Sequence, residues 1–363
     1  MTIVANTCPF VIGVDTHARS HALSILIAAT GAVIDEAQFP ATVAGLARAI
    51  DWAARRTGGD LAALWVIECV GAYGARMAAS VTQAGYQAVE AARMNARANR
   101  GVGKSDPLDA RRIAASVLPL EVNRLRHPRK DDGVRAALRV LVTARDMMTT
   151  ERTAVINALT ALVRTVELGI DARRSLTSSQ IAQIAKWRDR NEDIARAIAR
   201  TEAVRLAKRV VTLNNEITQN TATMTELIKQ SPAKGLLDKP GVGPVTAAVA
   251  MAAWSHEGRL RDEAAFASLA GVNPIPASSG NIVRHRLNRG GDRRLNRALH
   301  MAVVTRMAHD PQTRAYVERR RAEGRTTREI RRLLKRYLAR QIFRQLNATC
   351  RSVKAPPTSP VAA

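Results

Sequence analysis

The stretch FVIGVDTHARSHALSILIAATGAVIDEAQF, residues 10–39, decides the fold of the first part of the chain. It contains three β-like apolar runs, FVIGVDTH, HALSILIAA and AVIDEAQF, and a Thr30–Gly31 turn separates the last two. Short apolar runs bounded by turn residues are typical of strands. The stretch therefore predicts a three-stranded β-meander.

Helical and strand patterns alternate after the meander. Residues 41–56 show apolar side chains at helical spacing, and LAALWVIECV reads as a buried strand. The predicted elements are a helix at 41–56, a strand at 61–70, a helix at 71–85 closed by Gly85, a strand at 86–91, and a helix at 105–118 with Pro107 near its first turn. We expect an α/β domain with a mixed sheet and flanking helices.

The remainder of the chain is predicted to be mainly α-helical. Residues 133–230 are expected to be helical throughout, with a hinge at 171–180, and the last residues, VKAPPTSPVAA, have a composition typical of disorder. The predicted organisation is an α/β domain at 1–125, a helical or coiled-coil linker and oligomerisation region at 126–232, a mainly helical C-terminal domain at 233–345, and a disordered tail at 346–363.

Positive charge is concentrated at the C-terminal end. The chain has a net charge of +25, yet residues 1–120 hold 11 Lys and Arg against 9 Asp and Glu, whereas residues 281–363 hold 21 against 5. Such a distribution favours chemistry at one end and polyanion binding at the other. No apolar run is long enough for a membrane-spanning helix, so nucleic acid is the favoured polyanion and no membrane partner is expected. The low aromatic content of 3% argues against a base-stacking platform.

Three cysteines, Cys8, Cys69 and Cys350, have neither metal-ligand spacing nor an even disulfide framework. We interpret them as reduced thiols of a cytoplasmic protein, with Cys69 buried in a strand.

Four acidic residues of the first domain fall at strand ends or helix starts. Asp15 and Glu68 interrupt apolar runs, and Asp106 and Asp109 begin a helix. Buried carboxylates are costly unless they are paired or bind a metal, so the four could share Mg²⁺ or Mn²⁺. Each also has an ordinary interpretation: a turn residue for Asp15, a helix-dipole carboxylate for Asp106, and an ion pair with Arg112 for Asp109.

Two motifs in the C-terminal domain suggest contact with phosphates. PGVGP, residues 240–244, has the form of a helix–hairpin–helix turn, in which Gly241 and Gly243 let backbone N–H groups approach DNA, although an ordinary loop between helices is the alternative. SSGN, residues 278–281, is a polar turn followed by arginines that could hold a scissile phosphate. The residues predicted to bind nucleic acid are Lys104, Arg111, Arg112, Gly241, Gly243, Arg284, Arg286, Arg289, Arg293 and Arg294.

The motifs VDTH (14–17), IECVGAYG (67–74) and KSDPLDARR (104–112) resemble the three acidic motifs of the DEDD insertion-sequence transposases, the group of the Piv and MooV proteins and the bridge-RNA-guided serine recombinases. The resemblance covers nearly the whole chain. It implies a RuvC-like domain of the RNase H-like fold, with Asp15, Glu68, Asp106 and Asp109 as a catalytic metal tetrad.

The same resemblance implies that a serine in an SG motif is the nucleophile that forms a covalent phosphoserine with DNA. We prefer Ser279, which directly precedes Gly280, to Ser278. The resemblance further implies a structured guide RNA and a dimer or tetramer, in which the serine docks against the tetrad.

The sequence is compatible with three functions. The favoured one is a DNA transposase or site-specific recombinase that cuts and rejoins strands. The alternatives are a metal-dependent Holliday-junction-type nuclease that uses water, and a non-catalytic basic protein that binds nucleic acid. The first alternative keeps the acidic residues and needs no serine, whereas the second needs neither.

Overall fold

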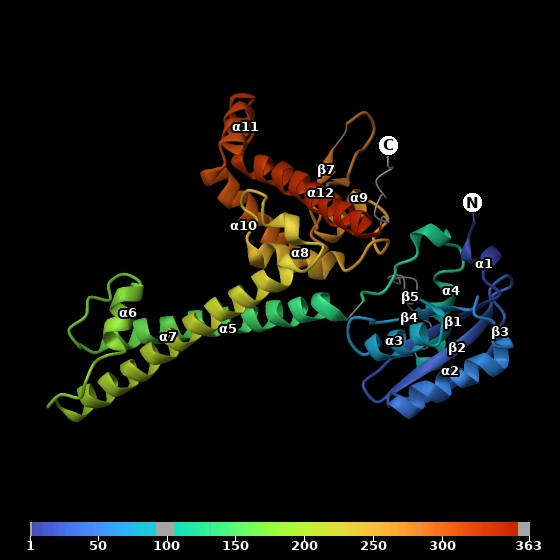
Figure 1. Ribbon diagram of the computed structural model, residues 1–363, viewed down its shortest axis with the longest axis horizontal. Coiled ribbons are helices and arrows are strands. Elements are labelled where there is room, and N and C mark those ends of the chain that lie inside the picture. Colours follow the sequence, from blue (N-terminus) through green and yellow to red (C-terminus); the bar gives the residue numbers. More distant parts are fainter. Residues whose placement is uncertain (1, 92–104, 131, 283, 355–363) are drawn as a thin grey trace, which may run out of the picture. The chain divides into compact units, whose positions relative to one another are not determined.

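The computed structural model describes residues 2–91, 105–130, 132–282 and 284–354 of the chain (Figure 1). The chain divides into two compact units. Unit 1 comprises residues 1–130 together with 255–265, and unit 2 comprises residues 131–254 together with 266–363.

Unit 1 contains a five-stranded mixed sheet. Its strands are β1 (Phe10–Thr16), β2 (Ser20–Ile27), β3 (Val33–Pro40), β4 (Leu64–Ile67) and β5 (Gln87–Glu90), in the spatial order β3-β2-β1-β4-β5. The first three strands are antiparallel, and β4 and β5 run parallel to β1. The predicted meander and mixed sheet are confirmed.

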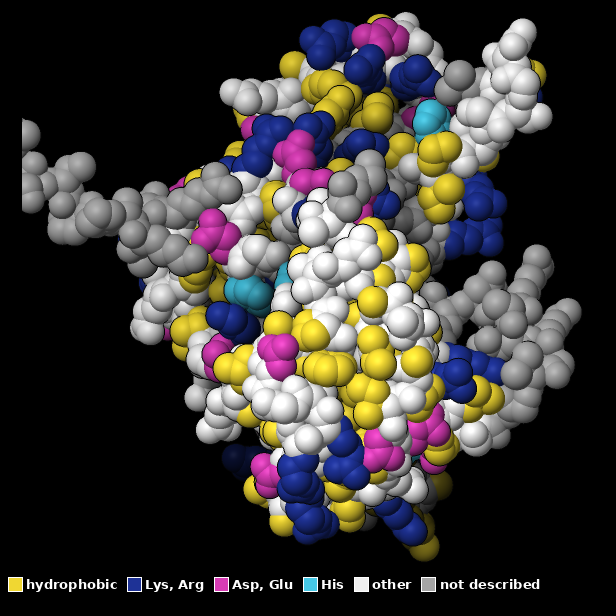
Figure 2. All heavy atoms as spheres, turned by 90° about the vertical axis from the view of Figure 1, so that its right-hand side faces the viewer, with side chains coloured by type: hydrophobic (Ala, Val, Ile, Leu, Met, Phe, Trp, Pro, Cys, Tyr) yellow, Lys and Arg dark blue, Asp and Glu magenta, His cyan; other side chains and the backbone are white. Residues whose placement is uncertain are grey.

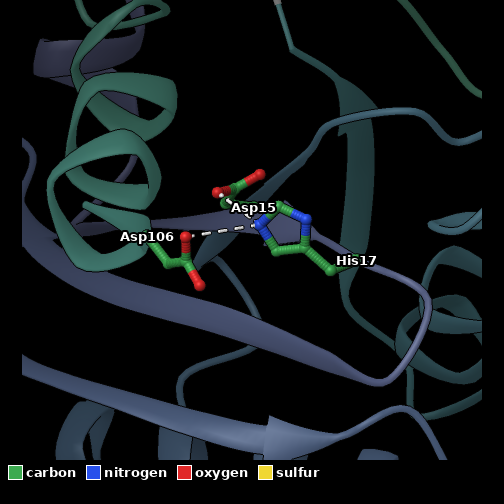
Figure 3. A group of neighbouring side chains, drawn as sticks. All are labelled: Asp15, His17 and Asp106. Atoms are coloured by element: carbon green, nitrogen blue, oxygen red, sulfur yellow. Dashed lines mark hydrogen bonds and ion pairs between the residues drawn. The ribbon is translucent and has the colours of Figure 1, made fainter. Parts of the chain in front are cut away.

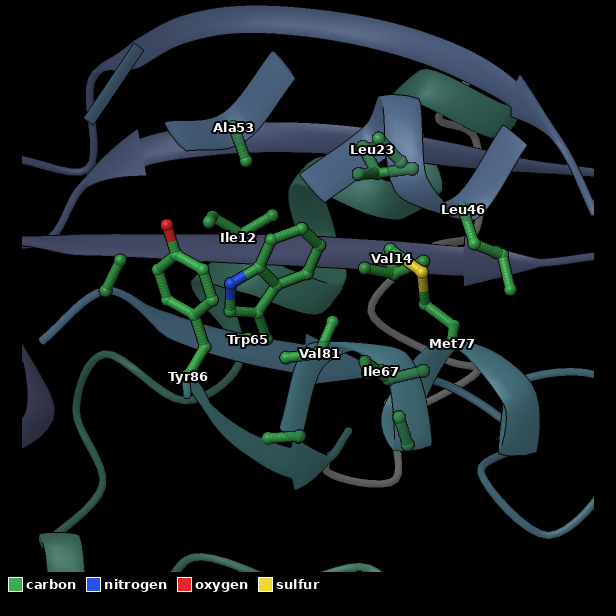
Figure 4. Packing of buried hydrophobic residues seen from close by; sticks show 14 of the residues in the cluster. Ile12, Val14, Leu23, Leu46, Ala53, Trp65, Ile67, Met77, Val81 and Tyr86 are labelled. Carbon is green, nitrogen blue, oxygen red and sulfur yellow. The ribbon is translucent and has the colours of Figure 1, made fainter. Parts of the chain in front are cut away.

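Helices cover both faces of this sheet, because successive side chains of a strand point to opposite sides. On one face, Ile12 and Trp65 pack beneath helices α2 (Val43–Thr57) and α3 (Ala75–Gln83), as Figure 4 shows. On the other face, Val11 and Val66 pack with α1 (Val4–Thr7) and α4 (Asp106–Ala115). Complete burial of a side chain such as Ile12 contributes roughly 1.5–3 kcal/mol, so the sheet is a stable support for residues at its edge.

Unit 2 is mainly helical. Its elements are α5 (Gly133–Thr165), α6 (Ser178–Ile184), α7 (Ile194–Lys229), α8 (Pro244–Trp254), α9 (Glu263–Leu269), α10 (Arg293–His309), α11 (Pro311–Ala322) and α12 (Thr327–Lys354), with a small hairpin of β6 (Ile275–Pro276) and β7 (His285–Arg286). The described elements also include two short 3-10 helices, Val122–Arg124 in unit 1 and Lys234–Leu236 in unit 2. The first residues of α9 belong to unit 1.

The long helices α5 and α7 form a helical hairpin (Figure 1). Leu159 and Val163 of α5 pack against small residues of α7 such as Ala203, and Arg145 donates from α5 to the Ile217 carbonyl at 3.1 Å. Both helices also contact α8. Residues 131–254 and 266–345 thus belong to one compact unit, whereas residues 126–130 and 255–265 belong to unit 1.

Three sequence predictions need correction. The segment 133–230 is not helical throughout, since residues 166–177 and 185–193 lie outside helices. The disordered tail predicted from residue 346 is wrong for residues 346–354, where α12 continues to Lys354 because Leu346 is completely buried in the core. The predicted strand at 61–70 is limited to Leu64–Ile67, so Cys69 is exposed in a turn rather than buried in a strand.

Candidate metal centre

Two of the predicted carboxylates meet where β1 and β4 end. Parallel strands bring their carboxyl ends to the same edge of a sheet, and the Glu68 N–H extends the β1–β4 ladder by donating to the Val14 carbonyl at 3.0 Å. The Thr16 hydroxyl donates to the Glu68 carbonyl at 3.1 Å. These bonds fix Glu68 beside Asp15, whose side chain is almost fully buried.

Helix α4 supplies the other two carboxylates from its first turn. Asp106 and Asp109 are both in this turn, a favourable position for acids near the positive end of the helix dipole. The helix lies close to β1 at Gly13, because a Cβ at that position would be 2.1 Å from the Ala110 carbonyl oxygen. The glycine therefore sets the approach of α4 to the strand that carries Asp15.

A histidine links the two elements, as Figure 3 shows. The His17 Nε2 lies 3.2 Å from a carboxylate oxygen of Asp15 and 3.5 Å from one of Asp106. Sequence reasoning missed His17 as a site residue. The available signal was its spacing, since a residue two positions after Asp15 in an extended chain lies on the same side.

The pKa of Glu68 shows that the carboxylates act on one another. Burial raises this pKa first, and then a hydrogen bond with Asp15 and the negative charges of Asp15 and Asp109 raise it further. Of the four predicted tetrad residues, Asp15 and Asp106 are linked through His17. Glu68 and Asp109 are related to them only by the hydrogen bond and the charges that raise the pKa of Glu68.

These residues suit a hard divalent cation. Mg²⁺ and Mn²⁺ prefer carboxylate oxygens, and two carboxyl groups that share a hydrogen bond at a buried edge are relieved of repulsion when a cation binds between them. Asp15, His17 and Asp106 each offer a ligand atom, and these atoms all lie within 4.8 Å of one another. Asp109 also forms the ion pair with Arg112 that was the alternative interpretation, because the Arg112 guanidinium donates to it at 3.0 Å.

The turn after Glu68 is tightly constrained. Cys69 has a φ of 48°, an uncommon backbone conformation for a residue with a side chain. Its carbonyl accepts from the Gly74 N–H at 3.1 Å. A Cβ on Gly74 would be 2.4 Å from the Glu68 carbonyl oxygen, so glycine is required for this turn to close against the site.

The predicted nucleophile belongs to unit 2, in the β6–β7 hairpin. Ser279 forms an isolated bridge with Ile282, and Gly280 has a φ of 55°. The Ser278 hydroxyl is used across the hairpin, where it accepts from the Arg284 N–H at 3.2 Å. The Ser279 side chain is exposed and makes no hydrogen bond to another residue within the described part of the chain.

The predicted PGVGP turn packs against another helix. Gly241 has a φ of 71°, and a Cβ there would be 2.5 Å from the Ala302 carbonyl oxygen of α10. Gly243, by contrast, is exposed with no atom near its Cβ position. Close packing therefore explains Gly241, and Gly243 is the glycine of this turn that is open to a ligand.

The predicted nucleic-acid contacts differ in their availability. Lys104 lies outside the described residues, and Arg112 is engaged by Asp109, whereas Arg111 is exposed. In unit 2, Arg294 pairs with Asp146 at 2.8 Å. The exposed arginines that remain are Arg284, Arg286, Arg289 and Arg293. Lys and Arg side chains also gather over the helices of the C-terminal end in the upper part of Figure 2.

Within the described ranges, every helix is too short or too polar to span a lipid bilayer.

Comparison with known proteins finds two transposase family models that match different parts of the chain. A transposase model of the DEDD type matches residues 12–167, and a model described as transposase IS116/IS110/IS902 family matches residues 233–318. The chain is 31% identical over 292 residues to an uncharacterized 42 kDa protein of insertion element IS900 from Mycobacterium paratuberculosis, covering 66% of this chain and 70% of that protein. It is also 36% identical over 107 residues to an uncharacterized 43.6 kDa protein of insertion element IS110 from Streptomyces coelicolor, covering 29% of this chain and 26% of that protein.

The sheet, its acidic edge and these similarities define a transposase, an enzyme that cuts and rejoins DNA. The chain belongs to the IS116/IS110/IS902 family of insertion-element transposases.

Proposed function

We propose that this transposase cleaves DNA with a metal tetrad in unit 1 and a nucleophilic serine in unit 2. The observation that supports it is the meeting of Asp15 of β1 and Asp106 of α4 at His17, with Glu68 hydrogen-bonded to Asp15. The strand order, with an antiparallel meander and two further parallel strands, supports an RNase H-like, RuvC-like domain. Asp15, Glu68, Asp106 and Asp109 would hold Mg²⁺ or Mn²⁺, which neutralises charge on the reacting phosphate when bound.

Ser279 is the proposed nucleophile. Its Oγ attacks the scissile phosphorus, an Oγ–P bond forms as a sugar O–P bond breaks, and the hydroxyl proton ends on the departing sugar oxygen. A second strand end then displaces the serine, which restores the hydroxyl and rejoins the DNA. The exposed side chain of Ser279 supports this role over Ser278, whose hydroxyl holds the hairpin closed.

Partners beyond DNA follow from the resemblance stated above. We propose that a structured guide RNA selects the DNA sites and that the active enzyme is a dimer or tetramer. The excess of positive charge in residues 281–363 supports binding to either nucleic acid. Sequencing the RNA that co-purifies with the expressed protein tests the guide, and an absence of any enriched RNA would count against it.

Covalent capture tests the serine. The full-length protein is incubated with Mg²⁺ and labelled DNA carrying an element end, and protein–DNA adducts are resolved on a denaturing gel. We expect Ser279→Ala to abolish the adduct, and Ser278→Ala to retain it at a reduced level because only the hairpin is loosened. Cleavage without an adduct in the wild type would instead indicate a nuclease that uses water. An adduct that persists in Ser279→Ala overturns the assignment.

Calorimetric titration with Mn²⁺ tests the tetrad independently of cleavage. Asp15→Asn and Glu68→Gln each remove a ligand charge from the buried edge, so we expect metal affinity to fall by at least about tenfold. Asp60→Asn is the matched control, because Asp60 lies in an exposed loop of unit 1. Equal affinity in the wild type and Asp15→Asn would show that the metal binds elsewhere.

A further inference from the structure

Two neighbouring cavities of unit 2 share a wall. The first, of about 310 Å³, lies between residues 271–274, β7 with the loop that follows it, and residues 325–336. The second, of about 540 Å³, lies between residues 288–290, α10 and Lys335. Asn288 and Lys335 line both cavities. The two cavities are therefore adjacent, and we call the pair the α12 trough.

The α12 trough is lined by more cations than the protein neutralises: Arg297 pairs with Asp146 and Arg325 lies near Glu329, whereas Lys335 is held by a neutral carboxamide. Lys335 donates to the Asn296 carboxamide at 3.0 Å, and burial lowers the pKa of Lys335, with the charges of Arg332 and Arg331 lowering it further. Burial also lowers the pKa of His300, and the positive charges of Lys335 and Arg331 lower it further.

Acids are scarce among the lining residues. Within the described part of the chain, Glu329 is the acid that lines the first cavity, and none lines the second. Glu329 already accepts from the Thr326 N–H at 2.9 Å and lies 3.8 Å from Arg325. Half-buried cations that repel one another are stabilised by an external anion, so the trough favours a ligand with phosphate groups.

The first cavity also has apolar walls, which would not contribute to binding a phosphate group alone. Val272, Leu287 and Leu333 line it, and the carboxamides of Asn273 and Asn288 hydrogen-bond to each other at 2.7 Å beside them. Its volume is within the range of small-molecule sites. Apolar walls with carboxamides at one end match a nucleobase, which has apolar faces and a polar edge.

We propose that the first cavity of the α12 trough holds the base of one unpaired nucleotide, with Lys335 and Arg332 on its phosphate and the next phosphate in the second cavity. The nucleotide must be unpaired because a base enters such a cavity only outside the stack of a duplex. The inference rests on the chain binding nucleic acid, but on neither the metal centre nor Ser279.

Equilibrium binding of the full-length protein tests this inference. The probes are duplexes with one extrahelical adenosine, the same duplexes with an abasic residue at that position, and fully paired duplexes, each made as DNA and as RNA. EDTA is present throughout, so strand cleavage does not contribute. We expect the extrahelical base to be preferred over the abasic residue by roughly tenfold, in the range of one well-buried base. The DNA and RNA arms show which strand supplies the nucleotide.

Two pairs of variants separate base binding from general effects. Leu287→Asn makes the wall polar and should reduce the preference for the base to threefold or less. Met301→Asn is its control, because Met301 is 54% exposed against 51% for Leu287 and lines neither cavity. Lys335→Met should weaken binding of all probes more than Arg328→Met, which removes the same charge from an exposed position of the same helix.

Thermal unfolding completes the test. Lys335→Met removes a half-buried cation that its neighbours repel, so its unfolding temperature should equal or exceed that of the wild type. A fall in this temperature, together with no greater loss of binding than in Arg328→Met, would assign Lys335 a structural role and overturn its placement on the phosphate. No base preference in the wild type, or an unchanged preference in Leu287→Asn, overturns it equally. If the wild type prefers the extrahelical base but Ser279 forms no covalent adduct with DNA, the proposed serine chemistry is refuted and the inference about base binding stands.

Discussion

His17 lies between two carboxylates of the acidic edge. Its Nε2 lies between carboxylates of Asp15 and Asp106, where it is the hydrogen-bond donor available to both. A half-exposed imidazole can rotate away, in contrast to the buried Asp15. We therefore infer that His17 holds the carboxylates together before metal binding and is displaced or becomes a ligand afterwards.

His17→Ala separates these two outcomes. If the imidazole offsets the repulsion between the carboxylates of Asp15 and Asp106, its loss leaves them to repel one another. The unfolding temperature should then fall by a few degrees in EDTA, and the rise on adding Mn²⁺ should be larger than in the wild type. Differential scanning fluorimetry in both conditions measures the effect. A smaller rise with Mn²⁺ would make His17 a ligand instead.

Single residues also show how far sequence reasoning reaches. The cost of an acid inside an apolar run predicts a role for Asp15 and Glu68, and in the structure these two side chains share a hydrogen bond. Cys69 was placed wrongly in a strand, because the apolar run continues past the point where its φ of 48° turns the chain. Nothing in local spacing distinguishes Gly74, whose role depends on the fold of that turn.

At the scale of elements, the contact between α4 and β1 sets the geometry of the site. The helix brings Asp106 and Asp109 to the sheet, and Gly13 permits its close approach. Ile113 and Ala114 are completely buried on the same helix, so the packing of α4 fixes the position of its first turn. Metal affinity should therefore depend on a residue that touches no metal.

Gly13→Ala tests this dependence. The new Cβ would clash with the Ala110 carbonyl, and overpacking of this kind costs about 1–3 kcal/mol or more. We expect a lower unfolding temperature and, at temperatures where the protein is folded, at least several-fold weaker Mn²⁺ binding in calorimetry. Gly71→Ala is the control, since its Cβ would meet no atom within 4 Å. Unchanged metal affinity in a destabilised Gly13→Ala would show that α4 adapts without moving its acids.

Elements were predictable where periodicity is strong. The meander and α4 follow from apolar runs and a proline near the first turn, and both are present. The β6–β7 hairpin was not predicted, because strands of two residues show no alternation. The composition of the last residues predicts disorder from residue 346, whereas α12 continues to Lys354 and buries Leu346 in the core.

At the scale of the whole molecule, we expect an acidic site and a basic surface to respond to Mg²⁺ in opposite ways. The acidic edge is proposed to need the ion, whereas the cations of residues 281–363 would bind phosphates that Mg²⁺ also binds. Neutralising 6–10 phosphates implies a loss of about 10³–10⁵ in affinity between 50 and 200 mM salt. Divalent ions compete at lower concentrations than monovalent ones, because they screen phosphate charge more strongly.

Strand cleavage should therefore pass through a maximum as Mg²⁺ is raised. The rising limb reports occupancy of the acidic edge, and the falling limb reports loss of DNA from the basic surface. At subsaturating DNA, adding KCl should lower the falling limb further. At saturating DNA, it should leave the rising limb in place. Asp15→Asn should remove cleavage while its DNA affinity declines with Mg²⁺ as in the wild type, measured by fluorescence anisotropy. A plateau in place of the maximum at subsaturating DNA would show that binding does not depend on charge in the way the composition predicts.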